Sequence, residues 1–176
     1  MSKILVNEEL LKEIKDQLVG TQQDKYVEST QMVLNNISAI LQRQATKRVI
    51  VAGGRNLKDY KLIEHTLNEL MENQPNQIEI VSGGQMSIDE FGNRFGADYL
   101  AEQWAEKNAI QIHKFPANWN KHNKAAGPIR NRQMAQYGDA LIAFWDGITR
   151  GTQSMIEEAR AAKLPVNVIR YVISQD

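Results

Sequence analysis

The sequence predicts an α/β protein, doubly wound, with a mainly parallel sheet of about five strands and helices on both faces. From residue 47 onward, short β-branched runs alternate with amphipathic segments of helical period, as in βαβ units. These runs are apolar throughout, as expected of parallel strands buried on both faces. Residues 1–45 show neither strand patterns nor glycine clusters. We therefore expect two parts, an N-terminal helical extension at 1–45 and an α/β domain at 46–176.

The N-terminal extension is predicted to form a helical hairpin. Its first helix ends at Gly20, a residue type that commonly terminates helices. The second begins at Asp24, a preferred N-cap residue, and its apolar residues recur at helical spacing as far as Leu41. This apolar face either covers the sheet of the same chain or pairs with a second copy or a partner.

The α/β domain is predicted to alternate strands with helices in order along the chain. Gly127 and Pro128 open one of these helices, and Pro128 suits a first turn because its missing N–H has no partner there. The expected strands are RVIVAGG, IEIVSGG, IQIHKFP, DALIAFWDG and PVNVIRYV, and the expected helices are KLIEHTLNELMEN, GADYLAEQWAEKN, GPIRNRQMAQYG and TQSMIEEARAAK.

Composition excludes several classes of protein. Lys and Arg together number 21, equal to Asp and Glu, and this zero net charge disfavours general binding to nucleic acid. The chain has no cysteine and three scattered histidines, so we expect neither disulfides nor a metal site formed by side chains. No apolar run approaches the roughly 18 residues of a membrane span, so we expect no membrane segment and a cytoplasmic protein.

The loops after the first four strands predict a ligand site. In an open parallel sheet, ligands bind beyond the carboxyl ends of the strands. Arg130, Arg132 and Arg150 lie near predicted helix N-termini, where the helix dipole disfavours a cation and a bound anion would relieve the repulsion. A phosphate suits such a site. The ligand-binding candidates are Gly53, Gly54, Arg55, Ser82, Gly83, Gly84, Asp98, Trp119, Lys124, Gly127, Arg130, Asn131, Trp145, Asp146, Gly147, Arg150, Gly151 and Thr152.

Aromatic and acidic residues near these loops extend the prediction. The rings of Trp119 and Trp145 are candidates for stacking on a base. No spacing forms a recognised catalytic pair, and a Mg²⁺ would come with the phosphates of a nucleotide. The acid–base candidates are Asp98, Asp146, Glu157 and His122.

Seven segments between about residues 48 and 170 resemble the YspA-like proteins of the SLOG superfamily. This superfamily also contains DprA/Smf proteins and the lonely-guy phosphoribohydrolases. The resemblance implies a Rossmann-like sheet and a nucleotide-type ligand at the strand ends, but no settled activity. The segments are VAGGRNLKDY, IVSGG, GADYLAEQWA, FPANW, KAAGPIRNRQMA, DALIAFWDG and RGTQSMIEEA.

The chain departs from the family pattern in two places. Residues 85–95 intervene between the second glycine pair and the following helix, and we expect this insertion to act as a lid or to alter ligand choice. The phosphoribohydrolases carry a GxGTxxE pattern whose glutamate works on the ribose, whereas this chain has Met155 at that position. The second departure weakens the expectation of phosphoribohydrolase activity.

Three functions follow from the sequence. The first is a module that binds a nucleotide or nucleotide derivative in order to sense, sequester or deliver it. The second is an enzyme that cleaves an N-glycosidic or phosphate bond of a nucleotide. The third is an interaction protein that forms homo-oligomers or binds a partner through residues 1–45. A DNA-binding role, by analogy with DprA, is a weaker fourth.

Overall fold

A computed structural model describes residues 46–73 and 77–172. Its centre is a five-stranded sheet of order β5-β2-β1-β6-β7, and all neighbouring strands are parallel. The predicted parallel sheet is thereby confirmed, whereas the predicted helical hairpin at 1–45 lies outside the described residues. The strands are β1 (Lys47–Gly53), β2 (Ile78–Ser82), β5 (Ile112–Lys114), β6 (Ala140–Trp145) and β7 (Val166–Arg170).

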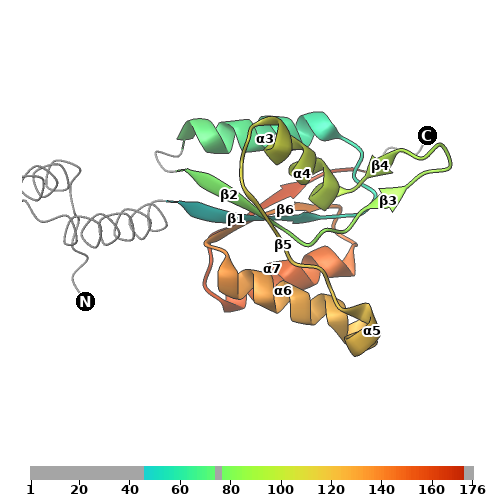
Figure 1. Ribbon diagram of the computed structural model, residues 1–176. Coiled ribbons are helices and arrows are strands. Elements are labelled where there is room, and N and C mark those ends of the chain that lie inside the picture. The colour runs from blue at the N-terminus through green and yellow to red at the C-terminus, as the bar shows by residue number, and fades with distance from the viewer. Residues whose placement is uncertain (1–45, 74–76, 173–176) are drawn as a thin grey trace, which may run out of the picture. The chain divides into compact units, whose positions relative to one another are not determined.

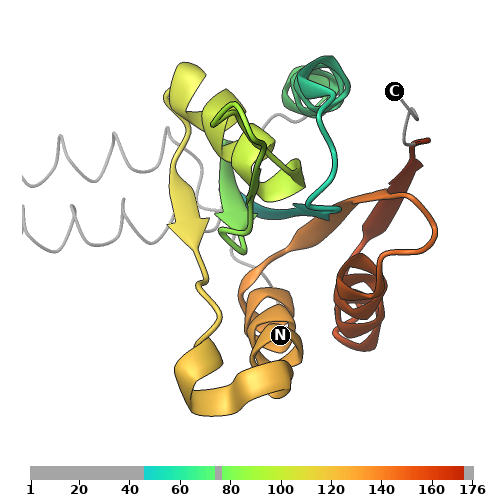
Figure 2. The ribbon, with the colours of Figure 1, turned by 90° about the vertical axis from the view of Figure 1, so that its right-hand side faces the viewer.

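Helices cover both faces of this sheet, as predicted (Figures 1 and 2). Helices α3 (Tyr60–Asn73) and α4 (Ala97–Lys107) lie on one face. Helices α6 (Ala126–Tyr137) and α7 (Arg150–Ala161) lie on the other. Every helix in the described ranges is too short or too polar to traverse a lipid bilayer.

The apolar strands bury side chains on both faces of the sheet. In β1, Val49 and Val51 pack in the core beneath α3 and α4, whereas Ile50 and Ala52 pack in the core beneath α6 and α7. Successive side chains of a strand point to opposite faces, so a strand covered on both sides is apolar at nearly every position. Trp104 of α4 is fully buried, and its indole N–H donates to Asn68 Oδ1 at 2.9 Å.

The order of the strands creates one crevice at the carboxyl edge. From β1 the chain moves outward through β2 to β5, and it then returns to the other side of β1 at β6 and β7. The loops after β1 and β6 therefore lead to opposite faces of the sheet. In doubly wound folds, ligands bind at this reversal point.

Residues 85–95, the predicted insertion, contain a small antiparallel hairpin of β3 (Ser87–Ile88) and β4 (Arg94–Phe95). Asp89 shapes its turn, since its carboxylate accepts from the N–H groups of Phe91 and Asn93. The side chains of Ile88 and Phe91 are 58% and 81% exposed. The hairpin projects at the carboxyl edge of the sheet (Figure 1). Its role as a lid stays a prediction.

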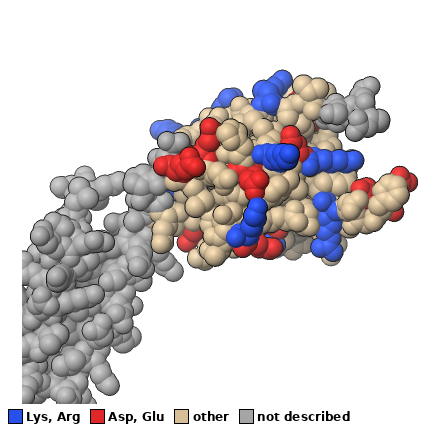
Figure 3. Space-filling model, turned by 90° about the horizontal axis from the view of Figure 1, so that it is seen from above, with Lys and Arg blue, Asp and Glu red and all other residues tan. Residues whose placement is uncertain are grey.

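The face covered by α3 and α4 mixes acidic and basic side chains (Figure 3). Among its described residues no extended patch of one sign is present, in line with the zero net charge. Extended basic surfaces are the usual electrostatic signature of nucleic-acid binding.

Substituting Gly53 by alanine is expected to destabilise the domain. An added Cβ would lie 2.5 Å from Ala97 Cβ and 2.6 Å from the carbonyl oxygen of Phe144, and neither atom belongs to a flexible side chain. Overpacking of this kind costs about 1–3 kcal/mol. Thermal unfolding should show a midpoint lowered by several degrees.

Gly151→Ala is the matched control for that measurement. The Cβ that this change would add meets open space, with no contact to the described residues beyond the backbone of its own helix and its chain neighbours. We expect an unchanged or slightly higher midpoint, because alanine is favoured over glycine within helices. Equal midpoints for the two variants would contradict the close approach at Gly53.

A candidate nucleotide site at the carboxyl edge of the sheet

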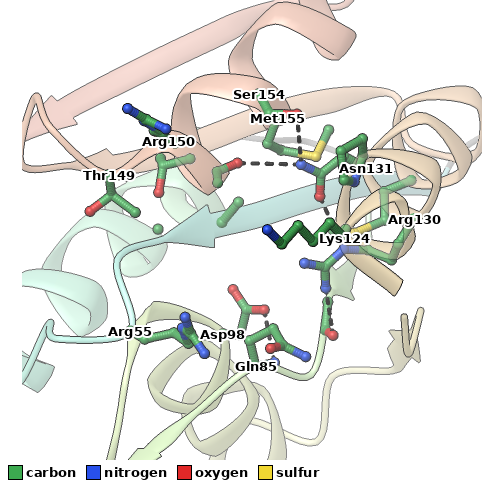
Figure 4. A pocket seen from close by; sticks show the side chains of 18 of the residues that line it. Arg55, Gln85, Asp98, Lys124, Arg130, Asn131, Thr149, Arg150, Ser154 and Met155 are labelled. Atoms are coloured by element: carbon green, nitrogen blue, oxygen red, sulfur yellow. Dashed lines mark hydrogen bonds between the residues drawn. The ribbon is translucent and has the colours of Figure 1, made fainter. Parts of the chain in front are cut away.

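A cavity of about 340 Å³ lies at the crevice between β1 and β6. Its walls come from the loops after β1, β2, β5 and β6 and from helices α4, α6 and α7 (Figure 4). The predicted convergence of four loops is therefore realised at one cavity. The predicted ligand-binding residues that line it are Gly53, Arg55, Gly83, Asp98, Trp119, Lys124, Gly127, Arg130, Asn131, Arg150, Gly151 and Thr152.

The N-terminus of α7 forms one wall. In the described part of the chain, the N-cap residue Thr149 makes no side-chain capping bond, and the first turn holds no acidic residue. The first N–H groups of a helix have no intrahelical partner, so those at Arg150, Gly151 and Thr152 remain available to an acceptor. The side chain of Thr152 is only 2% exposed, and its hydroxyl has no partner among the described residues. This wall therefore presents unused hydrogen-bond donors and a positive dipole to the cavity.

Asp146 stabilises the loop between β6 and α7. Its carboxylate accepts from the N–H groups of Ile148 and Thr149 and from the hydroxyl of Thr149, at 2.8–2.9 Å and 2.6 Å respectively. Burial acts to raise the pKa of Asp146, but these hydrogen bonds outweigh it and hold the pKa below its ordinary value. Gly147 follows with φ of 87°, a conformation that favours glycine. Asp146 and Gly147 thus support the site without lining the cavity.

Asp98, in the first turn of α4, lies on the opposite wall. Its side chain is buried, and Oδ2 accepts from the N–H of Gln85 at 3.0 Å. No ion pair to Asp98 forms within the described residues. Burial raises the pKa of Asp98 to about 6, although the Gln85 hydrogen bond and the charge of Arg130 act in the opposite direction. A strongly perturbed carboxyl in a cavity is a frequent mark of a functional site.

Arg130 joins α6 to the loop after β2. Its Nη1 donates to the carbonyl oxygen of Gly83 at 2.6 Å, and its Nε donates to Asn131 Oδ1 at 3.0 Å. Asn131 in turn donates to the carbonyl oxygen of Gly151 and to Ser154 Oγ, each at 3.3 Å. This chain of contacts connects the walls formed by β2, α6 and α7. Its role as an anion contact stays a prediction, whereas its hydrogen bonds give Arg130 a positioning role between these walls.

Three further cations lie around the cavity, and their side chains are exposed. Lys124 extends into the space between Asp98 and the start of α7, and Arg55 approaches from the side of Asp98 (Figure 4). Arg150 extends away from the centre (Figure 4). The ammonium group of Lys124 therefore lies in the central cavity together with the backbone donors of α7.

Trp119 and Trp145 differ in their relation to the cavity. Trp119 lines it from the short helix α5 (Trp119–His122), is 48% exposed, and lies beside Gly127, whose added Cβ would meet its ring at 3.4 Å. Trp145 does not line it. Its indole N–H donates to the carbonyl oxygen of Thr149 at 3.2 Å, and Arg170 lies over its ring at 4.8 Å. Trp119 is therefore the better placed ring for stacking.

Several predicted residues lie outside the cavity lining. Ser82 is buried, donates to Glu102 Oε1 at 2.5 Å and accepts from the N–H of Gly84 at 3.0 Å. Arg132 pairs with Glu158 on the surface at 3.2 Å. The predicted candidates that do not line the cavity are Gly54, Ser82, Gly84, Trp145, Asp146, Gly147, His122 and Glu157.

Other lining residues had not been singled out as ligand contacts. Gln85 is the first residue of the insertion at 85–95. Nothing in the sequence indicates that it lines the cavity. Thr149 precedes α7, and Met155 lies one turn into it, at the position where the phosphoribohydrolases carry their glutamate. The lining residues absent from the prediction are Ala52, Gln85, Pro128, Met134, Thr149, Ser154 and Met155.

Comparison with known proteins identifies the family. A family model described as "YspA, cpYpsA-related SLOG family" matches residues 47–122. The Gene 61 protein of Mycobacterium phage D29 is 31% identical over 121 residues, which cover 68% of this chain and 94% of that protein. No solved structure gives a significant match. The chain belongs to the YspA, cpYpsA-related SLOG family, and this membership indicates a nucleotide-related ligand at a coarse level.

Gly83→Ala is expected to disturb the cavity more than the fold. The new Cβ would lie 1.7 Å from Arg130 Nη1 and 2.9 Å from Asp98 Oδ2, so the guanidinium must leave the Gly83 carbonyl. Because that clash involves the end of a flexible side chain, we expect a smaller loss of thermal stability than for Gly53→Ala. Amide shifts of Asn131 and Gly151 in a ¹⁵N spectrum should nevertheless move. An unchanged spectrum at both positions would contradict the connecting role of Arg130.

Proposed function

We propose that this protein binds a nucleotide or a nucleotide-derived phosphorylated ligand in the cavity and acts as a sensor or ligand-binding module. The observation that carries the proposal is the buried Thr152 hydroxyl without a partner at the uncapped start of α7. A buried hydroxyl without a hydrogen bond costs about 1–3 kcal/mol. Because the Thr152 hydroxyl is shielded in the empty site, we propose that the first turn of α7 adjusts when ligand binds, so that a phosphate oxygen accepts from it. The same oxygen would accept from the N–H groups of the first helical turn.

The remaining walls suit the other parts of a nucleotide. Lys124 supplies a positive charge beside the phosphate, and Trp119 offers an exposed ring for a base at the edge of the cavity. A volume of about 340 Å³ falls within the range of roughly 300–1,000 Å³ typical of small-molecule sites. We further propose that any Mg²⁺ arrives with the phosphates. Within the described ranges, no group of three or more acidic or histidine side chains could hold it.

Calorimetric titration of the full chain tests this proposal. The panel contains nucleoside monophosphates with each common base, the matching nucleosides, and inorganic phosphate. A monophosphate should bind at least about tenfold more tightly than its nucleoside, because charge-assisted hydrogen bonds at α7 are lost without the phosphate. No heat from any nucleotide at millimolar concentration, or equal affinity for nucleotide and nucleoside, would overturn the proposal.

A further inference from the structure

Asp98 presents an unused hydrogen-bond acceptor to the cavity. Oδ2 accepts from the N–H of Gln85, and a backbone hydrogen bond from Gly83 also reaches the carboxylate. An ionised carboxylate has about four acceptor sites, so these two donors leave part of its capacity unused. Figure 4 shows the carboxylate facing the open space between Arg55 and Lys124. The side chain is only 7% exposed, so the carboxylate has little contact with bulk water. A buried acceptor of this kind is stabilised by a ligand that donates hydrogen bonds to it.

The position of Asp98 restricts which part of a nucleotide can supply these donors. Phosphate oxygens only accept hydrogen bonds at neutral pH, and a carboxylate repels their charge. The exposed Trp119 is placed to receive the flat base, whereas Asp98 lies deep in the cavity. The sugar lies between phosphate and base in every nucleotide, and its hydroxyl groups are good donors.

We infer that Asp98 accepts hydrogen bonds from the ribose hydroxyls of the ligand and thereby selects ribonucleotides. This inference rests on the proposed function of the same cavity. The carboxylate also disfavours a second phosphate on this wall, because an unpaired like charge in a buried site weakens binding. The Asp98 side chain therefore selects the ligand in two ways. It attracts the ribose hydroxyls, and it repels a second phosphate on the same wall.

A double-mutant cycle between protein and ligand tests the inference. Calorimetry compares the monophosphate that the wild-type full chain binds with its 2′,3′-dideoxy analogue, on the wild type and on Asp98→Ala. The wild type should prefer the ribonucleotide by roughly 10- to 100-fold, since bonds to a charged acceptor are strong. In Asp98→Ala the preference should fall to within about twofold. Asp98→Asn, which keeps an acceptor for the Gln85 N–H, is the second variant in case alanine impairs folding, and it should reduce the preference partially.

Thr152→Val is the matched control, and it should weaken both nucleotides by a similar factor while preserving their ratio. Repeating the comparison with a monophosphate whose base lacks an exocyclic amine separates recognition of the base from recognition of the sugar. A preference that follows the exocyclic amine of the base rather than the sugar hydroxyls overturns the inference in favour of base recognition by Asp98. An equal preference in wild type and both Asp98 variants overturns any recognition by Asp98 while leaving nucleotide binding intact. Absence of binding by every nucleotide overturns the proposed function and this inference together.

Discussion

Thr152→Val should stabilise the unliganded domain and weaken its ligand. The Thr152 side chain is 2% exposed and its hydroxyl has no partner among the described residues, so the wild type carries an uncompensated polar group in its interior. Valine has nearly the same shape and removes that group. A gain of about 1–2 kcal/mol is expected, and it should raise the unfolding midpoint by several degrees.

The same substitution removes a donor from the proposed phosphate site. The affinity for a nucleoside monophosphate should therefore fall by roughly tenfold or more, while the affinity for the nucleoside stays unchanged. Thermal unfolding with and without nucleotide measures both effects in one experiment. Opposite signs for stability and affinity are expected because the same hydroxyl destabilises the empty domain and donates to the bound phosphate.

Thr66→Val provides the control for the chemistry of the substitution. The Thr66 hydroxyl donates to the carbonyl oxygen of Leu62 at 2.8 Å within α3, on the other face of the sheet. Its loss should produce no stabilisation and no change in ligand affinity. A wild-type-like or lower midpoint for Thr152→Val would mean that its hydroxyl is satisfied in solution, and unchanged nucleotide affinity would place the phosphate elsewhere.

Asp98→Asn should change how stability depends on pH. Burial raises the pKa of Asp98 from 3.8 to about 6, so the folded state holds this proton more tightly than the unfolded state does. The stabilising contribution of the protonated group is complete below about pH 4 and is lost as the pH rises through about 6. The shift of roughly two units corresponds to about 3 kcal/mol. Asparagine cannot ionise, and its side-chain oxygen still accepts from the Gln85 N–H.

Asp98→Asn is therefore expected to be more stable than the wild type at about pH 8, by up to about 3 kcal/mol, with the difference vanishing near pH 4. Thermal midpoints of both proteins across this range provide the measurement. Parallel curves between these limits would contradict a buried, unpaired carboxylate. A stabilising change at a residue that faces a cavity would also fit the usual conflict between stability and function.

Asp139→Asn is the control with the opposite sign. Burial acts to raise the pKa of Asp139, but the Arg48 backbone N–H and its guanidinium donate three hydrogen bonds of 2.9–3.0 Å, and the pKa is lowered. The stability from this pair is present above the unfolded pKa and is lost as the pH falls. Asp139→Asn should therefore destabilise the domain at neutral pH and have little effect in acid.

The topology explains why many cavity residues could be predicted from sequence. Gly53 ends a strand and Gly83 and Gly151 follow strands that are recognisable by their apolar runs, and parallel strands place the loops after them at one edge. No knowledge of side-chain conformations is needed for that step. The family resemblance, carried by segments such as GPIRN and AFWDG, pointed to the same edge.

The other features of the site depend on the directions in which side chains point. The position of a residue in the sequence does not specify that direction. Trp145 ends β6 next to the site, yet its ring lies under Arg170 of the neighbouring strand. Arg130 was identified as a cation for the ligand, but its bond to the Gly83 carbonyl arises from two segments 47 residues apart. Likewise, the sequence does not show that the Thr152 hydroxyl lacks a hydrogen-bond partner among the described residues, because this depends on the side chains around it.

A ¹⁵N-resolved titration of the full chain with the tightest-binding nucleoside monophosphate tests the central claim most directly. Backbone amides report hydrogen bonding at each residue separately, and the matching nucleoside serves as the reference ligand. We predict that the amides of Gly151 and Thr152, at the start of α7, shift with the nucleotide and not with the nucleoside. Saturable shifts confined to other parts of the domain, with these two amides unmoved, would contradict a phosphate site at α7.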